Sequence, residues 1–237
     1  MSKIHWKGGA LLAPTPPVMV TCGAGEKANI ITVAWTGLIC THPPRVSIAI
    51  RPTRHSYALI RESGEFVINL TPASLVRVAD YCGIYTGAKV DKFSATGLHK
   101  EEAQAVSCPI IAECPLALEC KVTDVLPQGT HDLFLADVVA VDVDDSIVDE
   151  NGKLMLDKAG LAAFAHGEYF ALGEKIGNFG CSVAKGQKGK PLTQTGAEQK
   201  PKTASDRPVT PIKRKSEQTS LAVKPRKAKP RKPREKK

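Results

Sequence analysis

The sequence has no long hydrophobic run. No segment approaches the roughly 18 consecutive apolar residues that a membrane-spanning helix requires. The apolar stretch that starts at Ala10 is soon interrupted by Pro14, Pro16 and Pro17. The first residues, Met1 to Lys7, are followed by no apolar core of signal-peptide length. We therefore expect a cytoplasmic protein without a membrane segment.

The seven cysteines form no metal or redox motif. They are scattered and odd in number, with no Cys-x-x-Cys pair, and no two histidines have zinc-ligand spacing. We therefore expect no metal and buried, reduced thiols, including that of Cys40. There is also no convincing Ser/His/Asp or Cys/His set and no Gly-x-Gly-x-x-Gly dinucleotide fingerprint. The sequence thus predicts no side-chain nucleophile.

Positive charge is concentrated at the C-terminal end. The formal net charge is +9, yet residues 185–237 alone hold 18 Lys and Arg against 4 Asp and Glu, so the remainder is mildly acidic. Aromatic residues disappear after about Cys181, and such a segment cannot bury enough apolar surface to offset its ordering entropy. We predict a folded domain over residues 1–182 and a disordered Lys/Arg/Pro-rich tail over 183–237. Weak binding of the tail to nucleic acid or other anionic surfaces and a purely solubilising role both stay open.

Short apolar runs rich in Val, Ile and Thr dominate the domain. Strands are predicted over residues 18–22, 30–35, 45–50 and 66–70. Alternating polarity predicts another strand over 116–123, joined through Pro127-Gln128-Gly129 to a long strand over 131–143. The order of elements is not that of a parallel βαβ sheet, so we expect a mainly β fold, a small β-barrel with helical excursions.

Three helices are predicted between the strands. One begins with Thr71 as its N-cap and Pro72 at its first position, and its apolar face continues to Cys82. A shorter one starts at Ser56, which we take as its N-cap, and ends before Gly64, which suits a C-terminal glycine cap. A third covers residues 157–166.

The most informative stretch for function spans residues 29–56. Trp35 offers a flat π-face, and Thr36 and Gly37 offer a hydroxyl and backbone amides to an aromatic heterocycle. The next strand leads into Arg51, Arg54 and His55, just ahead of the helix start at Ser56. Unpaired N–H groups and two guanidinium groups make such a helix start a phosphate site.

The ligand implied is a mononucleotide-like molecule with a ring and one phosphate. Each residue also has an ordinary structural alternative: Trp35 as a core residue, the arginines as solvated loop charges and His55 as part of a helix cap.

The segments 29–37, Pro43-Pro44 and Arg54-His55-Ser56 together resemble the flavoredoxin-like branch of the flavin reductase family. Residues 64–70, 91–93, 118–120 and 129–134 match further segments of that family. The resemblance covers roughly residues 10–180 in the family's order. It implies an FMN-binding split β-barrel that forms a homodimer, with the flavin near the subunit interface.

The resemblance also assigns residues to the flavin. Those expected to line the isoalloxazine and ribityl chain are Asn29, Thr32, Trp35, Thr36 and Gly37. Those expected at the phosphate are Arg51, Arg54, His55 and Ser56, with Lys92 adding charge, although Lys92 also fits a solvated loop lysine. His131, in Gly129-Thr130-His131, corresponds to a histidine on the nicotinamide side of the site, although it also fits an ordinary residue at a strand start.

The resemblance favours an NAD(P)H-dependent FMN reductase. Hydride would pass from NADH or NADPH directly to flavin N5, so no catalytic side chain is required. One alternative is a flavoredoxin-type electron carrier that keeps FMN bound and serves a redox protein partner. A third is a flavin-free nucleic-acid-binding protein.

Overall fold

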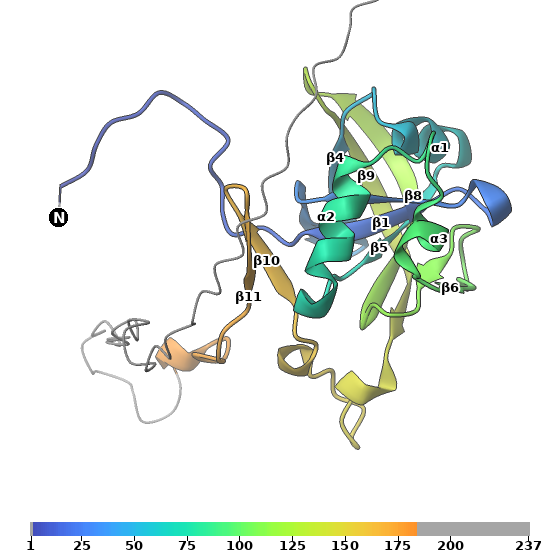
Figure 1. The fold of residues 1–237 in the computed structure, drawn as a ribbon. Coiled ribbons are helices and arrows are strands. Elements are labelled where there is room, and N and C mark those ends of the chain that lie inside the picture. The colour runs from blue at the N-terminus through green and yellow to red at the C-terminus, as the bar shows by residue number, and fades with distance from the viewer. Residues whose placement is uncertain (1, 184–237) are drawn as a thin grey trace, which may run out of the picture. The chain divides into compact units, whose positions relative to one another are not determined.

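A seven-stranded antiparallel sheet is the centre of the fold (Figure 1). The computed structural model describes residues 2–183, and residues 1–177 form one unit. The strand order in the sheet is β2-β1-β5-β8-β9-β4-β3. The strands are β1 (Val18–Cys22), β2 (Asn29–Val33), β3 (Thr36–Thr41), β4 (Pro44–Ile50), β5 (Glu65–Asn69), β8 (Leu116–Pro127) and β9 (Asp132–Val143). The predicted tail lies, except for Val183, outside the described residues.

The strand predictions are confirmed to within a few residues at each end. The hairpin prediction is confirmed as well, because Gln128 donates its backbone N–H to the carbonyl of His131 at 2.9 Å and Gly129 takes a φ of 81°. Strand β3 was not predicted. It pairs with β4 only, so it forms an edge of the sheet.

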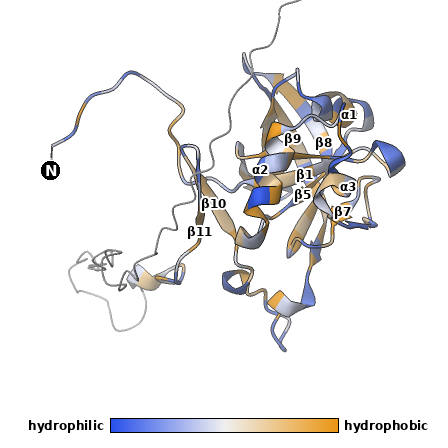
Figure 2. Cartoon of the chain, viewed as in Figure 1, coloured by the Kyte–Doolittle hydropathy of each residue, from blue (hydrophilic) through white to orange (hydrophobic). Residues whose placement is uncertain are grey.

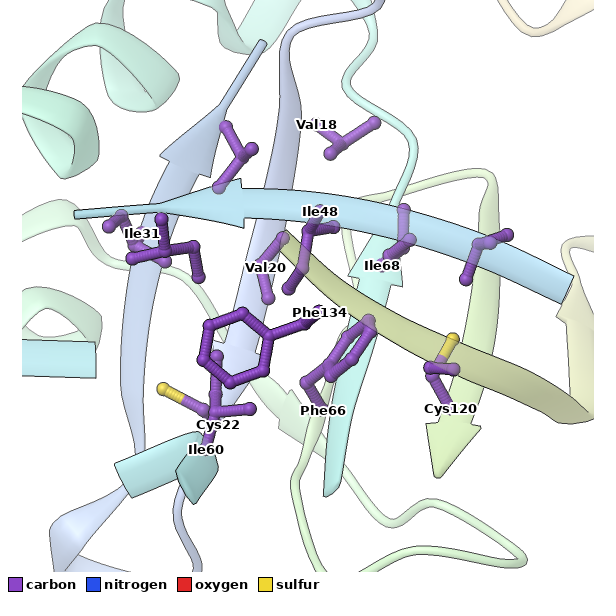
Figure 3. Packing of buried hydrophobic residues seen from close by; sticks show 14 residues of the cluster. Val18, Val20, Cys22, Ile31, Ile48, Ile60, Phe66, Ile68, Cys120 and Phe134 are labelled. Carbon is purple, nitrogen blue, oxygen red and sulfur yellow. The ribbon is translucent and has the colours of Figure 1, made fainter. Parts of the chain in front are cut away.

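The sheet curls around one hydrophobic core. Val46, Ile48 and Ile50 alternate along β4 and point into this core. There they pack with residues of β2, although β2 forms one edge of the sheet and β4 lies next to the other edge. Figure 3 shows Phe66 and Phe134 side by side in this core, with Ile48, Ile68 and Cys120 around them. Alternation of apolar and polar residues along each strand therefore gives the sheet a buried concave face. In Figure 2 the hydrophobic colour follows these central strands, and the loops are mostly hydrophilic.

Three α-helices flank the sheet: α1 (His55–Ser63), α2 (Val76–Ile84) and α3 (Lys92–Thr96). A second hydrophobic cluster holds α2 and α3 against the sheet, with Ala79, Cys82 and Phe93 packed on Met19 and Ile30 (Figure 1). Helix α1 ends as predicted at Gly64, which has a φ of 70° and donates its N–H to Ile60. Its first residue is His55 and its N-cap is Arg54, so the prediction of Ser56 as the cap is wrong by two residues.

Two further helix predictions need correction. Thr71 does not cap α2, because a 3-10 turn, Ala73–Leu75, intervenes and α2 begins only at Val76. The carbonyl of Thr71 instead accepts the N–H of Ala162 at 3.0 Å. The predicted helix over 157–166 is a 3-10 turn, Leu156–Lys158, followed by strand β10 (Ala162–Ala165). Gly160, with a φ of 57°, separates the two, and β10 pairs with β11 (Glu168–Ala171).

Two short strands complete the fold, β6 (Lys100–Glu101) and β7 (Ile110–Ile111), which pair with each other. The loop between them is held by the buried carboxylate of Glu119, which accepts the backbone N–H groups of Gln104, Ala105 and Val106.

All seven cysteines are free, and five of them are buried, which confirms most of the thiol prediction. Cys40 is an exception, because it is exposed on the edge strand β3, and Cys181 is exposed as well. No helix within residues 2–183 is long and apolar enough to cross a membrane. The same residues contain no group of three or more His, Cys, Asp or Glu side chains placed to hold a metal ion.

The side chain of Thr71 provides a test of the corrected helix start. Its hydroxyl is buried and has no hydrogen-bond partner in the part of the chain that the structure describes. We expect Thr71→Val to leave the free energy of unfolding within about 0.5 kcal/mol of wild type or to raise it, because no hydrogen bond is lost. Urea denaturation measures this.

Asp91 is the matched control. Its carboxylate caps α3 by accepting the N–H groups of Phe93 and Ser94. Asp91→Ala should therefore lower the free energy of unfolding by about 1 kcal/mol, the usual contribution of an N-cap residue. A comparable loss in Thr71→Val would contradict the corrected helix start.

Candidate functional site

An open cavity of about 330 Å³ lies at the end of β2. The cavity lies beside the C-terminal ends of β2 and β4, and the turn between β8 and β9 approaches both of these ends. Its lining consists of Ile31, Thr32, Val33, Ala34, Trp35, Ala49, Ile50, Arg51, Thr53, Arg54 and His131. The volume is in the range of small-molecule sites in proteins. We call this the ring-side cavity.

Two aromatic side chains form one wall of the ring-side cavity. Trp35 lies between β2 and β3, and its ring centroid is 4.3 Å from that of His131, at an interplanar angle of 49°. The Trp35 residue is 48% exposed. An exposed indole beside an imidazole provides a flat, polarisable surface on which a planar ring can stack.

Arg51 lines the same cavity and contacts this wall. Its Nε donates to His131 Nε2 at 3.3 Å. Burial, and then the charge of Arg51, lower the pKa of His131 below its ordinary value. His131 is therefore neutral at pH 7, as its acceptor role toward Arg51 requires.

A smaller cavity of about 70 Å³ adjoins the first and shares Ile31, Thr53 and Arg54 with it. We call it the phosphate-side cavity, after the ligand group that the sequence predicts there. The rest of its lining is Asn29, His55, Ser56, Tyr85, Thr86, Gly87 and Lys92. The start of α1 faces it, so the first N–H groups of that helix and the positive end of its dipole are directed at this small space.

Two buried polar side chains shape this end. Asn29, on β2, donates its Nδ2 hydrogen to Ser56 Oγ at 2.8 Å. Gly87 lies so close that a Cβ atom there would come within 2.1 Å of Asn29 Oδ1. Glycine at position 87 is therefore required if Asn29 is to keep its contact with Ser56.

Lys92 is the most unusual residue of the site. It opens α3 and is only 2% exposed. Its Nζ donates to the carbonyls of Ile30 at 2.5 Å and Cys82 at 2.7 Å. Burial lowers the pKa of Lys92 to about 8. An ammonium group has three N–H donors, so one is left for a further acceptor.

No carboxylate compensates this charge. Within residues 2–183, Lys92 forms no ion pair with an Asp or Glu. Its titratable neighbours include two thiols, and burial raises the pKa of Cys22 to about 12 and that of Cys82 to about 11, so both are neutral at pH 7. The guanidinium of Arg54 adds positive charge, and it is held by a hydrogen bond to the carbonyl of Gly83. The phosphate-side cavity is thus strongly cationic.

The structure brings together most of the residues that the sequence predicted for a ligand. Asn29, Arg54, His55, Ser56 and Lys92 line the phosphate-side cavity. Thr32, Trp35 and His131 line the ring-side cavity, where Arg51 also lies rather than at the phosphate end.

Thr36 and Gly37 line neither cavity and lie on β3, where the Thr36 hydroxyl donates to the carbonyl of Ser47 at 2.8 Å. Their contact with a ligand stays a prediction. Sequence reasoning missed Thr53, which precedes α1. It also missed Tyr85, Thr86 and Gly87, because nothing in the loop after α2 distinguishes it from an ordinary connection.

A family model described as "Flavin reductase like domain" matches residues 11–173. The chain belongs to this family. The fold is accordingly the split barrel of the flavin reductases, as the sequence predicted. One similar structure is the flavoredoxin of Desulfovibrio vulgaris (Miyazaki F), with 32% identity over 75% of this chain and 97% of that one and a TM-score of 0.70. Another is a putative flavin reductase with a split barrel domain from Shewanella frigidimarina, with 22% identity, 70% and 85% coverage and a TM-score of 0.63.

Among curated sequences, an uncharacterised protein of Aeropyrum pernix is 35% identical over 137 residues. These residues are 57% of this chain and 52% of that protein, so the similarity extends over about half of the relative. The family assignment rests on the family model, which matches most of the described residues.

The buried ammonium group of Lys92 predicts a specific pH dependence of stability. Between about pH 8 and its ordinary pKa near 10.5, Lys92 is deprotonated in the folded state and still protonated in the unfolded state. The unfolded state then binds more protons, so the contribution of Lys92 to stability rises with pH over this window. The free energy of unfolding of wild type should therefore increase relative to Lys92→Met between pH 8 and pH 10.

Chemical denaturation of both proteins at a series of pH values measures this difference and cancels the titration of the other groups. The exposed Lys153→Met is the control and should follow wild type at every pH. Parallel curves for wild type and Lys92→Met would show that Lys92 titrates at its ordinary pKa.

Proposed function

We propose that the joined cavities bind FMN and that the protein is an NAD(P)H-dependent flavin reductase. The observation that carries the flavin proposal is the buried ammonium of Lys92, which has no carboxylate partner within residues 2–183 and lines the same cavity as the start of α1. A buried charge without compensation is unfavourable, and a bound phosphate would supply the missing anion.

The residues present fit FMN at both ends. A phosphate in the 70 Å³ cavity would meet the third donor of Lys92, the Arg54 guanidinium and the N–H groups of α1. The ring-side cavity begins where this one ends, because the two share Ile31, Thr53 and Arg54. Its aromatic wall of Trp35 and His131 suits the isoalloxazine ring.

When bound, FMN would supply the hydride and electron chemistry. The protein's part is to hold the phosphate deep in the site and to leave the ring end open. Arg51 is exposed at that open end and keeps His131 oriented by its hydrogen bond. Its positive charge there favours the approach of an anionic co-substrate such as NADH or NADPH.

A homodimer is part of the same proposal. Exposed apolar side chains gather on the edge strand β3, where Leu38 is 80% exposed and Ile39 is 50% exposed. Trp35, just before β3, lies at the mouth of the ring-side cavity. On β9, Val139 and Val141 are also exposed. Exposed apolar groups of this size are typical of protein interfaces, and an interface over β3 would cover the open side of the ring-side cavity.

The second candidate is an electron carrier that keeps FMN and exchanges electrons with a protein partner. The similarity to the Desulfovibrio flavoredoxin over nearly its whole length favours it. The third candidate, a flavin-free nucleic-acid-binding protein, would depend on the tail, which lies outside the described residues. It predicts a colourless protein.

The phosphate assignment is tested by removing its polar groups. Arg54→Gln combined with Ser56→Ala should weaken FMN binding by about 1.5–3 kcal/mol, the range of hydrogen bonds to charged groups. Riboflavin, which lacks the phosphate, should lose little affinity. Isothermal titration calorimetry with both ligands measures the two losses.

The matched control changes the same residue types at the other end of α1, Arg61→Gln with Ser63→Ala, and should leave both affinities unchanged. Equal losses of FMN and riboflavin affinity in the Arg54/Ser56 variant would refute the phosphate assignment.

The reductase and carrier proposals differ in one measurement. The FMN-loaded protein is mixed with NADH or NADPH without oxygen, and flavin absorbance near the visible maximum is followed. A reductase should bleach within seconds with at least one of the two nucleotides. A protein that stays yellow with both, yet bleaches with dithionite, is a carrier.

A further inference from the structure

A further cavity borders the β10–β11 hairpin, α2 and the end of β2. Its volume is about 340 Å³, which is in the range of small-molecule sites in proteins. Its lining consists of Pro17, Thr32, Ala34, Asp80, Gly83, Ile84, Phe164, Gly167 and Tyr169. We call it the hairpin cavity. It shares Thr32 and Ala34 with the ring-side cavity, so a ligand in it would lie next to the proposed position of the flavin ring.

Two aromatic side chains of the hairpin form one corner of this cavity. The turn consists of His166 and Gly167, whose φ values of 49° and 90° suit a two-residue turn between antiparallel strands. This turn places Phe164 directly opposite Tyr169, with ring centroids 5.2 Å apart and an interplanar angle of 63°. Two backbone hydrogen bonds with Thr15, of 2.9 and 2.8 Å, hold Phe164 in position. Two rings in an edge-to-face arrangement leave a ring face free for a ligand.

Asp80 is the charged residue in the lining of the hairpin cavity. It lies on α2, beside the hairpin (Figure 1), and its Oδ1 accepts the hydroxyl hydrogen of Tyr169 at 3.2 Å. Burial, and then the charge of Asp80, raise the pKa of Tyr169 to about 12, so the phenol is neutral at pH 7 and acts as a donor. Within residues 2–183 Asp80 forms no ion pair, not even with Arg77, three residues earlier on α2. The described part of the chain therefore leaves this negative charge without a counter-ion.

This combination favours a cation that also has an apolar part. A carboxylate beside apolar groups attracts a positive charge more strongly than a carboxylate in open water, because the local dielectric constant is lower. The faces of aromatic rings attract cations as well. Pro17, Ala34 and Ile84 then provide apolar contacts for the remainder of such a ligand.

Two other occupants fit this lining less well. A metal ion needs several oxygen or nitrogen ligands, and residues 2–183 contain no group of three or more His, Cys, Asp or Glu side chains placed to hold one. An anion would be repelled by Asp80. The guanidinium of Arg54 could attract one, but it is held at the carbonyl of Gly83 and lines the ring-side and phosphate-side cavities instead.

We propose that the hairpin cavity binds a small organic cation, an ammonium group attached to an apolar body, with Asp80 as its counter-ion. The ammonium group would donate to the carboxylate and lie against the rings of Phe164 and Tyr169. The apolar body would extend along Ile84 and Ala34 toward the ring-side cavity. The hairpin cavity shares no residue with the phosphate-side cavity, so the cation site does not depend on FMN binding.

The test titrates the full chain with phenethylamine, which is an ammonium ion at pH 7, and follows the amide resonances by NMR. Phenethyl alcohol and hydrocinnamate are the neutral and anionic analogues of similar shape. Wild type should bind the amine at least about tenfold more tightly than the alcohol, since only the amine forms a charge-assisted hydrogen bond, and hydrocinnamate more weakly still. Resonances of Gly83 and Gly167 should shift with the amine.

Asp80→Asn removes the counter-ion and keeps an acceptor for the Tyr169 hydroxyl. It should weaken phenethylamine binding by about tenfold and change the affinity for phenethyl alcohol by less than about twofold. Phe164→Leu keeps an apolar side chain but removes a ring face, and should weaken phenethylamine binding by about threefold. Asp157→Asn is the matched control, because it removes an exposed carboxylate outside the hairpin cavity, and it should alter neither affinity.

Three results would overturn the cation site: no binding of phenethylamine to wild type, equal affinity of wild type for the amine and the alcohol, or unchanged amine affinity in Asp80→Asn. The first two use wild type alone, so they decide the matter even if Asp80→Asn does not fold. Failure of FMN to bind wild type would overturn the proposed function and would leave the preference for the amine unchanged.

Discussion

The candidate site depends on the ammonium group of Lys92, which is buried among backbone carbonyls. Its two hydrogen bonds join the start of α3 to β2 at Ile30 and to α2 at Cys82. Arg54 makes a parallel link, from the start of α1 to the end of α2 at Gly83. Three helices and the end of one strand thereby converge on one small cavity with two cations and no carboxylate ion-paired with Lys92 in the described chain. The same hydrogen bonds that position the helices also define where an anion is favoured.

Much of the fold could be predicted from local patterns, because those patterns have local causes. Alternating Val and Ile residues mark β1 and β4, and Gly64 ends α1 since it reaches the left-handed conformation without strain. The errors occurred where tertiary contacts override local signals. Thr71 has the sequence of a helix cap, but its carbonyl pairs with Ala162, about ninety residues later. The apolar residues after Gly160 fit a helix as well as a strand, and only the pairing of β10 with β11 decides between them.

In the candidate site, too, some features follow from local sequence and others depend on tertiary contacts. Asn29, Ser56 and Lys92 are far apart in sequence, and they were grouped through a family resemblance rather than through physical reasoning about spacing. The structure supplies the reason: β2 carries Asn29 past the start of α1, and α3 places Lys92 beneath the same point. Gly87 could not be identified, because its role depends on the distance to a side chain 58 positions earlier. Cys40 was expected to be buried because free thiols usually are, but an edge strand leaves its outer residues in solvent.

The two ends of the site differ in a way that bears on its use. At the phosphate end, Asn29, Ser56 and Lys92 are buried; Asn29 donates to Ser56, and Lys92 donates to two backbone carbonyls. At the ring end, Trp35 is half exposed and Arg51 is in solvent. A ligand held by its phosphate would therefore be retained while its ring stays within reach of a second molecule. Retention is required of an electron carrier and accessibility is required of a reductase, so the geometry of the pocket fits both proposed functions. Under either proposal, the mouth of the ring-side cavity decides the function, because Arg51 and the exposed apolar residues of β3 would there admit a nucleotide or be covered by a protein.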